Sequence, residues 1–456
     1  TIELTPEVKL ALAIDTEETE LNPNALMNAI LKAPVDLLWN GGIGTYVKSS
    51  AESHLDCGDR ANNALRVNGG ELRCKVVGEG GNLGMTQRGR IEAAFNGVLL
   101  NTDFIDNSAG VDTSDHEVNI KILLNSVMMA GELNLEQRNA FLASMTDEVG
   151  ELVLVDNYRQ NQALTVMEAM SVERMGSFAH FIQTLESQGL LDRGIEYLPS
   201  HAELLERKSK GLGLTRPELS VLLSYDKIVI FNQLLESDVP EDPYLSKELQ
   251  RYFPTPIQEK YAAHMQNHRL RREIIATAVT TCLVNRMGST FLLRMQEDTG
   301  ETPGQIAKAY AIIRETMQAR RLWAEIDALD HKVSESVQIK ALIGIWHLQR
   351  NLTRWLLTRP GQSLDIANRT ARYQQPFEVL LQQIPAALNQ AEAQAYRTSH
   401  KELLSIGLSP ALAHFMASTP YLNSAMDVIE LSLLEDKSVA DVAQAHYALS
   451  DALHIN

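Results

Sequence analysis

The sequence predicts an α/β segment followed by an all-α region. In the first 115 residues, short apolar runs stop at corners rich in Gly and Asn, and helix-like stretches separate these runs. Such alternation is typical of parallel α/β sheets. From residue 114 onward the apolar residues instead recur with the 3.6-residue period of a helix. Residues 270–297 keep this period throughout, and we expect them to form one long core helix.

The α/β segment contains three predicted strands and two predicted helices. The strands are residues 35–39, 74–77 and 98–100, and the helices are residues 23–32 and 87–96. The corners that follow the strands are residues 40–44, 78–84 and 101–103. Because ligands of parallel α/β sheets sit at the carboxyl ends of the strands, all three corners are candidate binding positions.

The composition limits the classes of partner and location. The 456 residues carry 41 Lys and Arg against 58 Asp and Glu, a net charge of −17, which disfavours nucleic acid or an anionic membrane as the main partner. Three cysteines without a C-x-x-C pair fit a reducing cytoplasm, the expected location. No apolar run reaches the ~18 residues of a membrane helix. Since the chain starts at Thr1 without a signal-like segment, we expect it to be a piece of a longer chain.

Two segments at the strand ends have side chains and backbone suited to a ligand, namely the corner of residues 78–84 and residues 103–110, which continue from the third corner. Four of the seven residues 78–84 are glycines, which lets the backbone approach a cofactor closely. Glycine clusters also end strands for purely geometric reasons, so this loop alone leaves both interpretations open. Asn107 and Ser108 can exchange hydrogen bonds with an amide such as a nicotinamide carboxamide, while Ala109 and Gly110 keep the approach open.

These residues resemble a known family, the glutamate dehydrogenases, and specifically the large NAD-dependent bacterial form. Val77-Gly78-Glu79-Gly80-Gly81-Asn82 is similar to the family's Val-Ala-Glu-Gly-Ala-Asn strand and turn. Asn107-Ser108-Ala109-Gly110-Val111 with Ser114 is similar to its Asn-Ala-Gly-Gly-Val and following Ser. Residues 39–48, 101–119 and 208–218 resemble the large subfamily more closely still. Ser108, Ala109 and Asp115-His116 depart from the wider family, which usually has Ala, Gly and Tyr-Phe there.

The resemblance implies a fold and an activity. Residues 1–130 would be the C-terminal half of a doubly wound, Rossmann-like NAD-binding domain, and residues 131–456 a C-terminal helical domain, with a further boundary near residue 300 compatible with the pattern. The whole enzyme would oxidatively deaminate L-glutamate to 2-oxoglutarate and ammonium, with hydride transfer to NAD. A homo-oligomer is expected.

The resemblance also implies roles for eight residues. The cofactor-binding residues would be Asn82, Asn107, Gly80, Gly81, Gly41 and Gly42, and the substrate-binding residues would be Ser114 and Val111. No catalytic residue is expected in this chain, because the family's Lys and Asp and its pyrophosphate turn match nothing here and would lie upstream. The fragment alone would then be inactive, and its own residues do not distinguish NAD from NADP.

Two alternatives remain open from the sequence. The helical part could be an oligomerisation or regulatory module without a substrate site, in which case the Gly/Asn corners would be structural. A dehydrogenase of another small amino acid would differ only in pocket residues that this chain mostly lacks.

Other polar clusters are expected to be structural. His264 and His268 have the i, i+4 spacing of a metal pair, but a third ligand is missing and no metal is expected. The basic stretches at residues 207–210 and 269–272 are interpreted as surface, and Cys57 as packed. Asp112 is expected to cap a helix that starts near Ser114.

Overall fold

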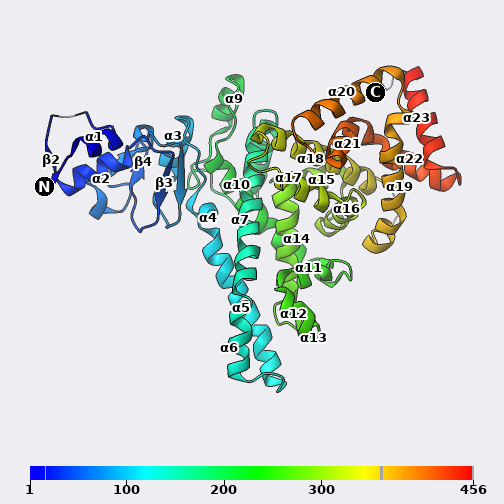
Figure 1. The fold of residues 1–456 in the computed structure, drawn as a ribbon, viewed down its shortest axis with the longest axis horizontal. Coiled ribbons are helices and arrows are strands. Elements are labelled where there is room, and N and C mark those ends of the chain that lie inside the picture. The colour runs from blue at the N-terminus through cyan, green and yellow to red at the C-terminus, as the bar shows by residue number, and fades with distance from the viewer. Residues whose placement is uncertain (16, 360–362, 454–456) are drawn as a thin grey trace. The chain divides into compact units, whose positions relative to one another are not determined.

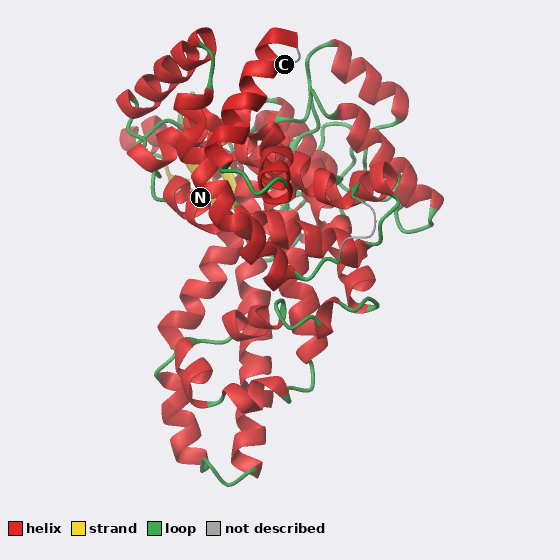
Figure 2. Cartoon of the chain, turned by 90° about the vertical axis from the view of Figure 1, so that its right-hand side faces the viewer, coloured by secondary structure: helices red, strands yellow, loops and turns green. Residues whose placement is uncertain are grey.

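The computed structural model describes residues 1–15, 17–359 and 363–453 (Figure 1). Helices dominate this part of the chain, and its strands are short and few (Figure 2). Two compact units can be distinguished. The first consists of Thr1–Ile228, Gln250–Arg271 and Gly288–Thr290, and the second of Val229–Leu249, Arg272–Met287 and the residues from Phe291 onward. The functional boundary expected near residue 130 stays a prediction.

The first unit contains the strands and the helices that follow them. Its strands are β1 (Ile2–Glu3), β2 (Glu20–Leu21), β3 (Leu37–Asn40), β4 (Val47–Lys48), β5 (Val67–Asn68) and β6 (Val76–Glu79). Its helices are α1 (Pro6–Leu12), α2 (Pro23–Leu31), α3 (Gln87–Phe95), α4 (Asp103–Asp106), α5 (Ser108–Met129), α6 (Leu135–Ala143), α7 (Thr146–Ala169), α8 (Met175–Ser187), α9 (His201–Ser209), α12 (Thr255–Lys260) and α13 (Ala262–Gln266). Helices α10 (Arg216–Leu235) and α11 (Ser246–Tyr252) have residues in both units.

The second unit is built from helices. They are α14 (Arg271–Met287), α15 (Phe291–Thr299), α16 (Pro303–Thr316), α17 (Ala319–Asp327), α18 (Glu335–Leu357), α19 (Ile366–Ala387), α20 (Gln390–Ser405), α21 (Pro410–Ser418), α22 (Ala425–Leu434) and α23 (Val439–Leu453). Helix α16 is buried almost all round and packs against α18 and α19, as expected for a central core helix. Its start is fixed by a capping box of Thr302 and Gln305.

The α/β segment has parallel pairing but only small sheets. Strands β3 and β6 pair in parallel with Leu37 opposite Val76. The third predicted strand forms only an isolated bridge, Val76 to Leu99, because the turn at Gly97 and the start of α4 at Asp103 leave only five residues between them. Each sheet among the described residues has two strands, so the expected doubly wound domain is not evident.

The two faces of this small sheet differ. One face packs against α3 through buried Val77, Ala93 and Leu100. On the other face Leu37, Trp39, Val76 and Leu99 remain 37–61% exposed. The sheet thus has one covered and one uncovered apolar face.

Two helix boundaries differ from the sequence prediction. The helix expected over residues 270–297 is two helices, because Gly288 and Thr290 adopt φ of +70° and +110° and break it between Met287 and Phe291. Helix α5 begins at Ser108 rather than near Ser114 and packs on α7. The interpretation of Asp112 as a helix cap is therefore wrong, since Asp112 lies inside the helix.

Two glycines of the first unit offer a matched test of the close packing of Gly69 against α3. A Cβ at Gly69 would lie 2.4 Å from the Gly89 carbonyl oxygen, whereas a Cβ at Gly150, inside α7, meets no atom within 4 Å. We expect Gly69→Ala to cost about 1–3 kcal/mol through overpacking and Gly150→Ala to gain about 0.5–1 kcal/mol through helix propensity. Thermal unfolding followed by circular dichroism measures both changes. Equal melting temperatures for the two variants would contradict the close approach of Gly69 to α3.

Candidate functional site

The first two corners lie against each other. The Gly81 N–H donates to the Asn40 carbonyl oxygen at 3.0 Å. A Cβ on Gly81 would lie only 2.6 Å from the Gly42 carbonyl oxygen, so only glycine permits this contact. The corner of Gly41 and Gly42 and the corner of Gly80 and Gly81 therefore form one glycine-lined edge at the carboxyl ends of β3 and β6.

The start of α5 joins this edge through a contact between two of the predicted residues. Asn107 Nδ2 donates to Asn82 Oδ1 and, at 3.5 Å, to the Gly81 carbonyl oxygen. Because that carbonyl can only accept, the Asn107 amide is oriented with its nitrogen towards Asn82 and its oxygen away. The Asn82 amide nitrogen and the Asn107 amide oxygen have no partner among the described residues, and together they offer one donor and one acceptor.

The two predicted substrate residues lie on the first turns of α5. Asn107, Val111 and Ser114 follow one another at i, i+4 and i+7, the spacing of one helix face. Val111 is 65% exposed, and the Ser114 hydroxyl donates to the Gly110 carbonyl oxygen at 3.3 Å. Both side chains are therefore accessible beside the Asn82–Asn107 contact.

A buried ion network that the sequence analysis did not identify holds the glycine-rich loop. Arg90 donates to both oxygens of Glu79, at 2.7 and 3.0 Å, and contacts Asp103 at 3.2 Å. The two carboxylates in turn accept from the backbone N–H groups of Met85 at 3.1 Å and Leu83 at 2.8 Å. Burial raises the pKa of Glu79, and the Arg90 guanidinium opposes that rise. A charged residue at the end of a buried strand was the available sequence signal.

Three amide side chains on α7 hold the corner that precedes α5. Asn161 Oδ1 accepts from Asn101 Nδ2 at 2.7 Å. Asn157 Nδ2 donates to the Ile105 carbonyl oxygen at 3.1 Å and to Ser108 Oγ at 2.9 Å. The third amide, Gln160 on the same helix, donates from Nε2 to Ser108 Oγ at 3.5 Å. Sequence spacing gave no signal for these contacts, because they join segments about fifty residues apart.

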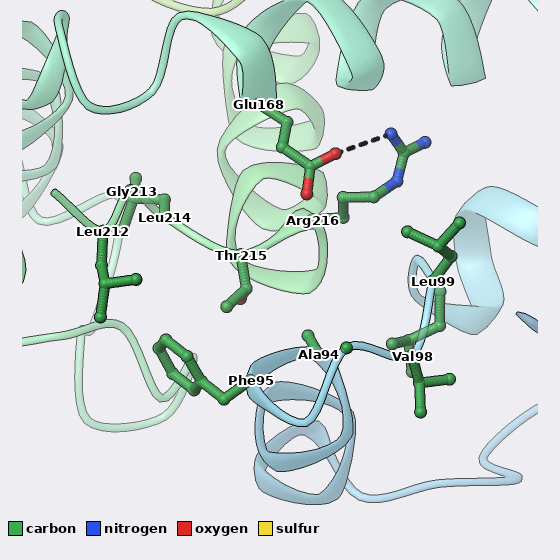
Figure 3. Close-up of a pocket in the computed structure, with 12 residues that line it drawn as sticks. Ala94, Phe95, Val98, Leu99, Glu168, Leu212, Gly213, Leu214, Thr215 and Arg216 are labelled. Atoms are coloured by element: carbon green, nitrogen blue, oxygen red, sulfur yellow. Dashed lines mark hydrogen bonds and ion pairs between the residues drawn. The ribbon is translucent and has the colours of Figure 1, made fainter. Parts of the chain in front are cut away.

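A cavity of about 210 Å³ lies behind this corner (Figure 3). It is lined by Ala94, Phe95, Gly97, Val98, Leu99, Leu100, Glu168, Leu212, Gly213, Leu214, Thr215 and Arg216. Arg216 pairs with Glu168 at 3.2 Å on the cavity wall and donates to Asn101 Oδ1 at 3.0 Å. None of the eight predicted site residues lines this cavity, so it is separate from the glycine-lined edge.

Titratable groups gather between α5, α7 and α10. Burial raises the pKa of Asp112 to about 6, with further contributions from Asp156 and Asp115, while Lys227 lowers it. Burial lowers the pKa of His116 to about 4, and its ring stacks on Tyr252 with centroids 4.3 Å apart. His116 is therefore neutral at pH 7.

The remaining candidate clusters have ordinary partners. His264 contacts Ser126 at 3.0 Å and Glu132 at 3.1 Å, whereas His268 contacts the Asn119 carbonyl oxygen at 3.0 Å. Among residues 1–15, 17–359 and 363–453, no three His, Cys, Asp or Glu side chains are placed to hold a metal ion. Within the same ranges, no helix combines the length and apolar character needed to cross a bilayer.

Parallel strands that end in glycine turns beside amide side chains are typical of nucleotide-binding α/β proteins. Two family profiles match the chain: "Bacterial NAD-glutamate dehydrogenase, catalytic domain" over residues 1–167 and "Glutamate dehydrogenase, C-terminal" over residues 211–456. The chain belongs to the bacterial NAD-glutamate dehydrogenase family, as the resemblance predicted.

Curated relatives agree with this assignment. The chain is 46% identical over 456 residues to the NAD-specific glutamate dehydrogenase of Halomonas elongata and 45% identical over 454 residues to that of Pseudomonas aeruginosa. It is 37% identical over 456 residues to that of Mycobacterium tuberculosis. These alignments cover 99–100% of the chain but only 28% of each relative.

The buried network can be tested by removing its cation. Arg90→Met leaves the Glu79 and Asp103 carboxylates buried without a counter-charge, and loss of one partner of a buried pair typically costs about 3–5 kcal/mol. We expect a correspondingly lower melting temperature. Glu79→Gln combined with Arg90→Met removes one of the two unpaired charges, so the double variant should be more stable than the sum of the single changes predicts. Strict additivity would contradict the network.

The raised pKa of Asp112 predicts a pH-dependent stability. Because the folded state holds the Asp112 proton more tightly than the unfolded state, this stabilisation is complete below about pH 4 and is lost as the pH rises through about 6. Asp112→Asn should therefore raise stability at pH 8 by about 1–3 kcal/mol and change little at pH 4. Melting temperatures at both pH values measure this. The control is Asp147→Asn, at an exposed position of α7 that does not contribute to the pKa of Asp112. An equal gain for Asp112→Asn at both pH values would refute the assignment.

Proposed function

We propose that this chain forms one wall of the cofactor and substrate cleft of an NAD-dependent glutamate dehydrogenase. The reaction would be L-glutamate + NAD⁺ + H₂O → 2-oxoglutarate + NH₄⁺ + NADH + H⁺. The observation that carries the proposal is the contact between Asn82 and Asn107, which joins the glycine-lined edge to the start of α5 in a chain of this family. The printed names of the relatives supply the substrate and the cofactor.

The residues of the edge fit a nicotinamide nucleotide. When bound, NAD accepts the hydride from the substrate's α-carbon. The Asn82 amide nitrogen and the Asn107 amide oxygen complement the acceptor and donor of a carboxamide. Gly80 and Gly81 would line the approach, and Gly41 and Gly42 would lie next to the adenosine side. These six residues bind and orient the cofactor.

The first turns of α5 would hold the substrate. Val111 is exposed and apolar, which suits the aliphatic part of glutamate, and the Ser114 hydroxyl can exchange its long bond to Gly110 for one to a carboxylate. Holding both reactants in line is worth several kcal/mol of the barrier in general. We propose that the catalytic Lys and Asp and the pyrophosphate turn come from the rest of a longer chain, of which this chain would be the C-terminal portion.

The uncovered apolar face of the sheet supports the proposal that residues of a longer chain complete the domain. Leu37, Trp39, Val76 and Leu99 form an exposed apolar face, and β3 pairs on one side only among the described residues. We propose that the remaining part of a doubly wound domain covers this face and edge. Residues 1–130 would then be the C-terminal part of the NAD-binding domain and residues 131–456 the C-terminal helical domain. A cytoplasmic homo-oligomer belongs to the same proposal, and the three free cysteines are compatible with it.

Steady-state kinetics of the full-length parent enzyme test the site. We expect Ser114→Ala and Asn107→Ala to lower kcat/KM for glutamate-dependent NAD reduction at least tenfold, about 1.4 kcal/mol each. Ser209→Ala is the matched control, because Ser209 is also an exposed helical serine bonded to a carbonyl of its own helix. The isolated 456-residue chain should show no turnover. Full activity of both variants would instead favour a helical oligomerisation or regulatory module, with the corners purely structural.

A further inference from the structure

A chain of hydrogen bonds connects α10 to the first residue of α5. Lys227 Nζ donates to Gln160 Oε1 at 2.6 Å. Gln160 Nε2 in turn donates to Ser108 Oγ at 3.5 Å. Ser108 directly follows Asn107, so this series ends beside the proposed cofactor contact.

Each hydrogen bond in the series from Lys227 through Gln160 to Ser108 has a fixed donor and a fixed acceptor. A protonated lysine can only donate, so the Gln160 oxygen faces Lys227 and its NH₂ group faces Ser108. Asn157 Nδ2 reaches Ser108 Oγ as well, and its orientation is fixed by the Ile105 carbonyl, which can only accept. Both amides thus donate to Ser108, whose oxygen accepts two hydrogen bonds. The hydroxyl proton must then be donated elsewhere, and no acceptor for it is found in the part of the chain that the structure describes.

We propose that Ser108 donates a hydrogen bond to an oxygen of the bound cofactor, and that Lys227 is a positioning residue that sets the direction of this bond through Gln160. This inference rests on the proposed function. It adds a residue to the eight to which the resemblance assigned roles, since Ser108 is not among them. The acceptor belongs to the chemical class of amide oxygens and lies beside the Asn82–Asn107 contact.

The charges around Lys227 favour its protonated form at neutral pH. Asp112 on α5 and Asp156 on α7 face it, and Asp156 also lies 4.0 Å from Arg159. Burial lowers the pKa of Lys227 to about 8, and the two aspartates oppose that shift. Above that pH the amine can also accept, so the amide of Gln160 is no longer held in one orientation.

One substitution can reverse the direction of the hydrogen bond between residue 160 and Ser108. Gln160→Glu keeps the shape and the contact with Lys227 but replaces the donor towards Ser108 by an acceptor, which takes up the Ser108 proton. We expect the dissociation constant of NADH, measured by fluorescence titration of the full-length enzyme, to rise roughly three- to tenfold. Ser108→Ala should weaken binding by a similar factor. In the Ser108→Ala background, Gln160→Glu should have no further effect, because the diverted proton is gone.

The role of Lys227 can be tested by the pH dependence of NADH binding. We expect the affinity of the wild-type enzyme for NADH to fall between pH 7.5 and 9, roughly one unit around the pKa of Lys227. The Lys227→Arg variant should keep its affinity over this range, because arginine stays a pure donor. Lys227→Met should show the weaker binding at every pH. Lys121→Met is the control for loss of a lysine, since Lys121 is a partly exposed residue on α5 paired with Glu117. Circular dichroism of each variant identifies loss of fold.

The outcomes of these measurements separate failure of the Ser108 inference from failure of the proposed function. Unchanged NADH affinity in both Ser108→Ala and Gln160→Glu would overturn the inference while leaving the proposed function intact. A raised KM for 2-oxoglutarate with unchanged NADH affinity would overturn the cofactor assignment in favour of a substrate carboxylate. Additive effects of the two changes would exclude Ser108 as the point through which Gln160 acts. If the wild-type enzyme neither binds NADH nor oxidises glutamate, the proposed function fails and this inference fails with it.

Discussion

The candidate site depends on a buried cation, Arg90, that satisfies two carboxylates at once. Glu79 and Asp103 are almost fully enclosed, and a carboxylate without a counter-charge in such a place would be strongly destabilising. With Arg90 between them, the two carboxylates also accept hydrogen bonds from backbone N–H groups of the loop after β6. The glycines of that loop allow close approach, but the ion network decides the path that the backbone takes.

The polar contacts behind this loop are arranged in layers. The corner before α5 is held by amides of α7. Lys227 of α10 donates to one of these amides, Gln160, and Arg216 of α10 donates to Asn101 in the corner itself. Cations can only donate, so they fix the orientation of the Gln160 and Asn101 amides. The helical region of the chain therefore takes part in shaping the edge, although it provides none of the predicted cofactor contacts.

The chain supports one edge of the candidate site although it spans only part of the length of its curated relatives. The chain covers 28% of the length of its curated relatives, and its small parallel sheet leaves one apolar face uncovered. What the chain does contain is the complete support of one edge: glycine corners, amide pair and the network beneath them. A wall of a cleft can be pre-organised in this way even when the reacting groups belong to another segment.

The sequence by itself determined the positions of the three corners, the helices α2 and α3, and the family. These features follow from local pattern, because glycine, capping oxygens and apolar periodicity act within a few residues. It did not predict the start of α5, the break at Gly288, or the partners of Glu79 and Ser108, and it predicted a strand where a single bridge lies. Only the tertiary structure decided these, because a buried charge or amide is satisfied by whatever group the fold brings near it, and spacing along the chain carries no record of that group.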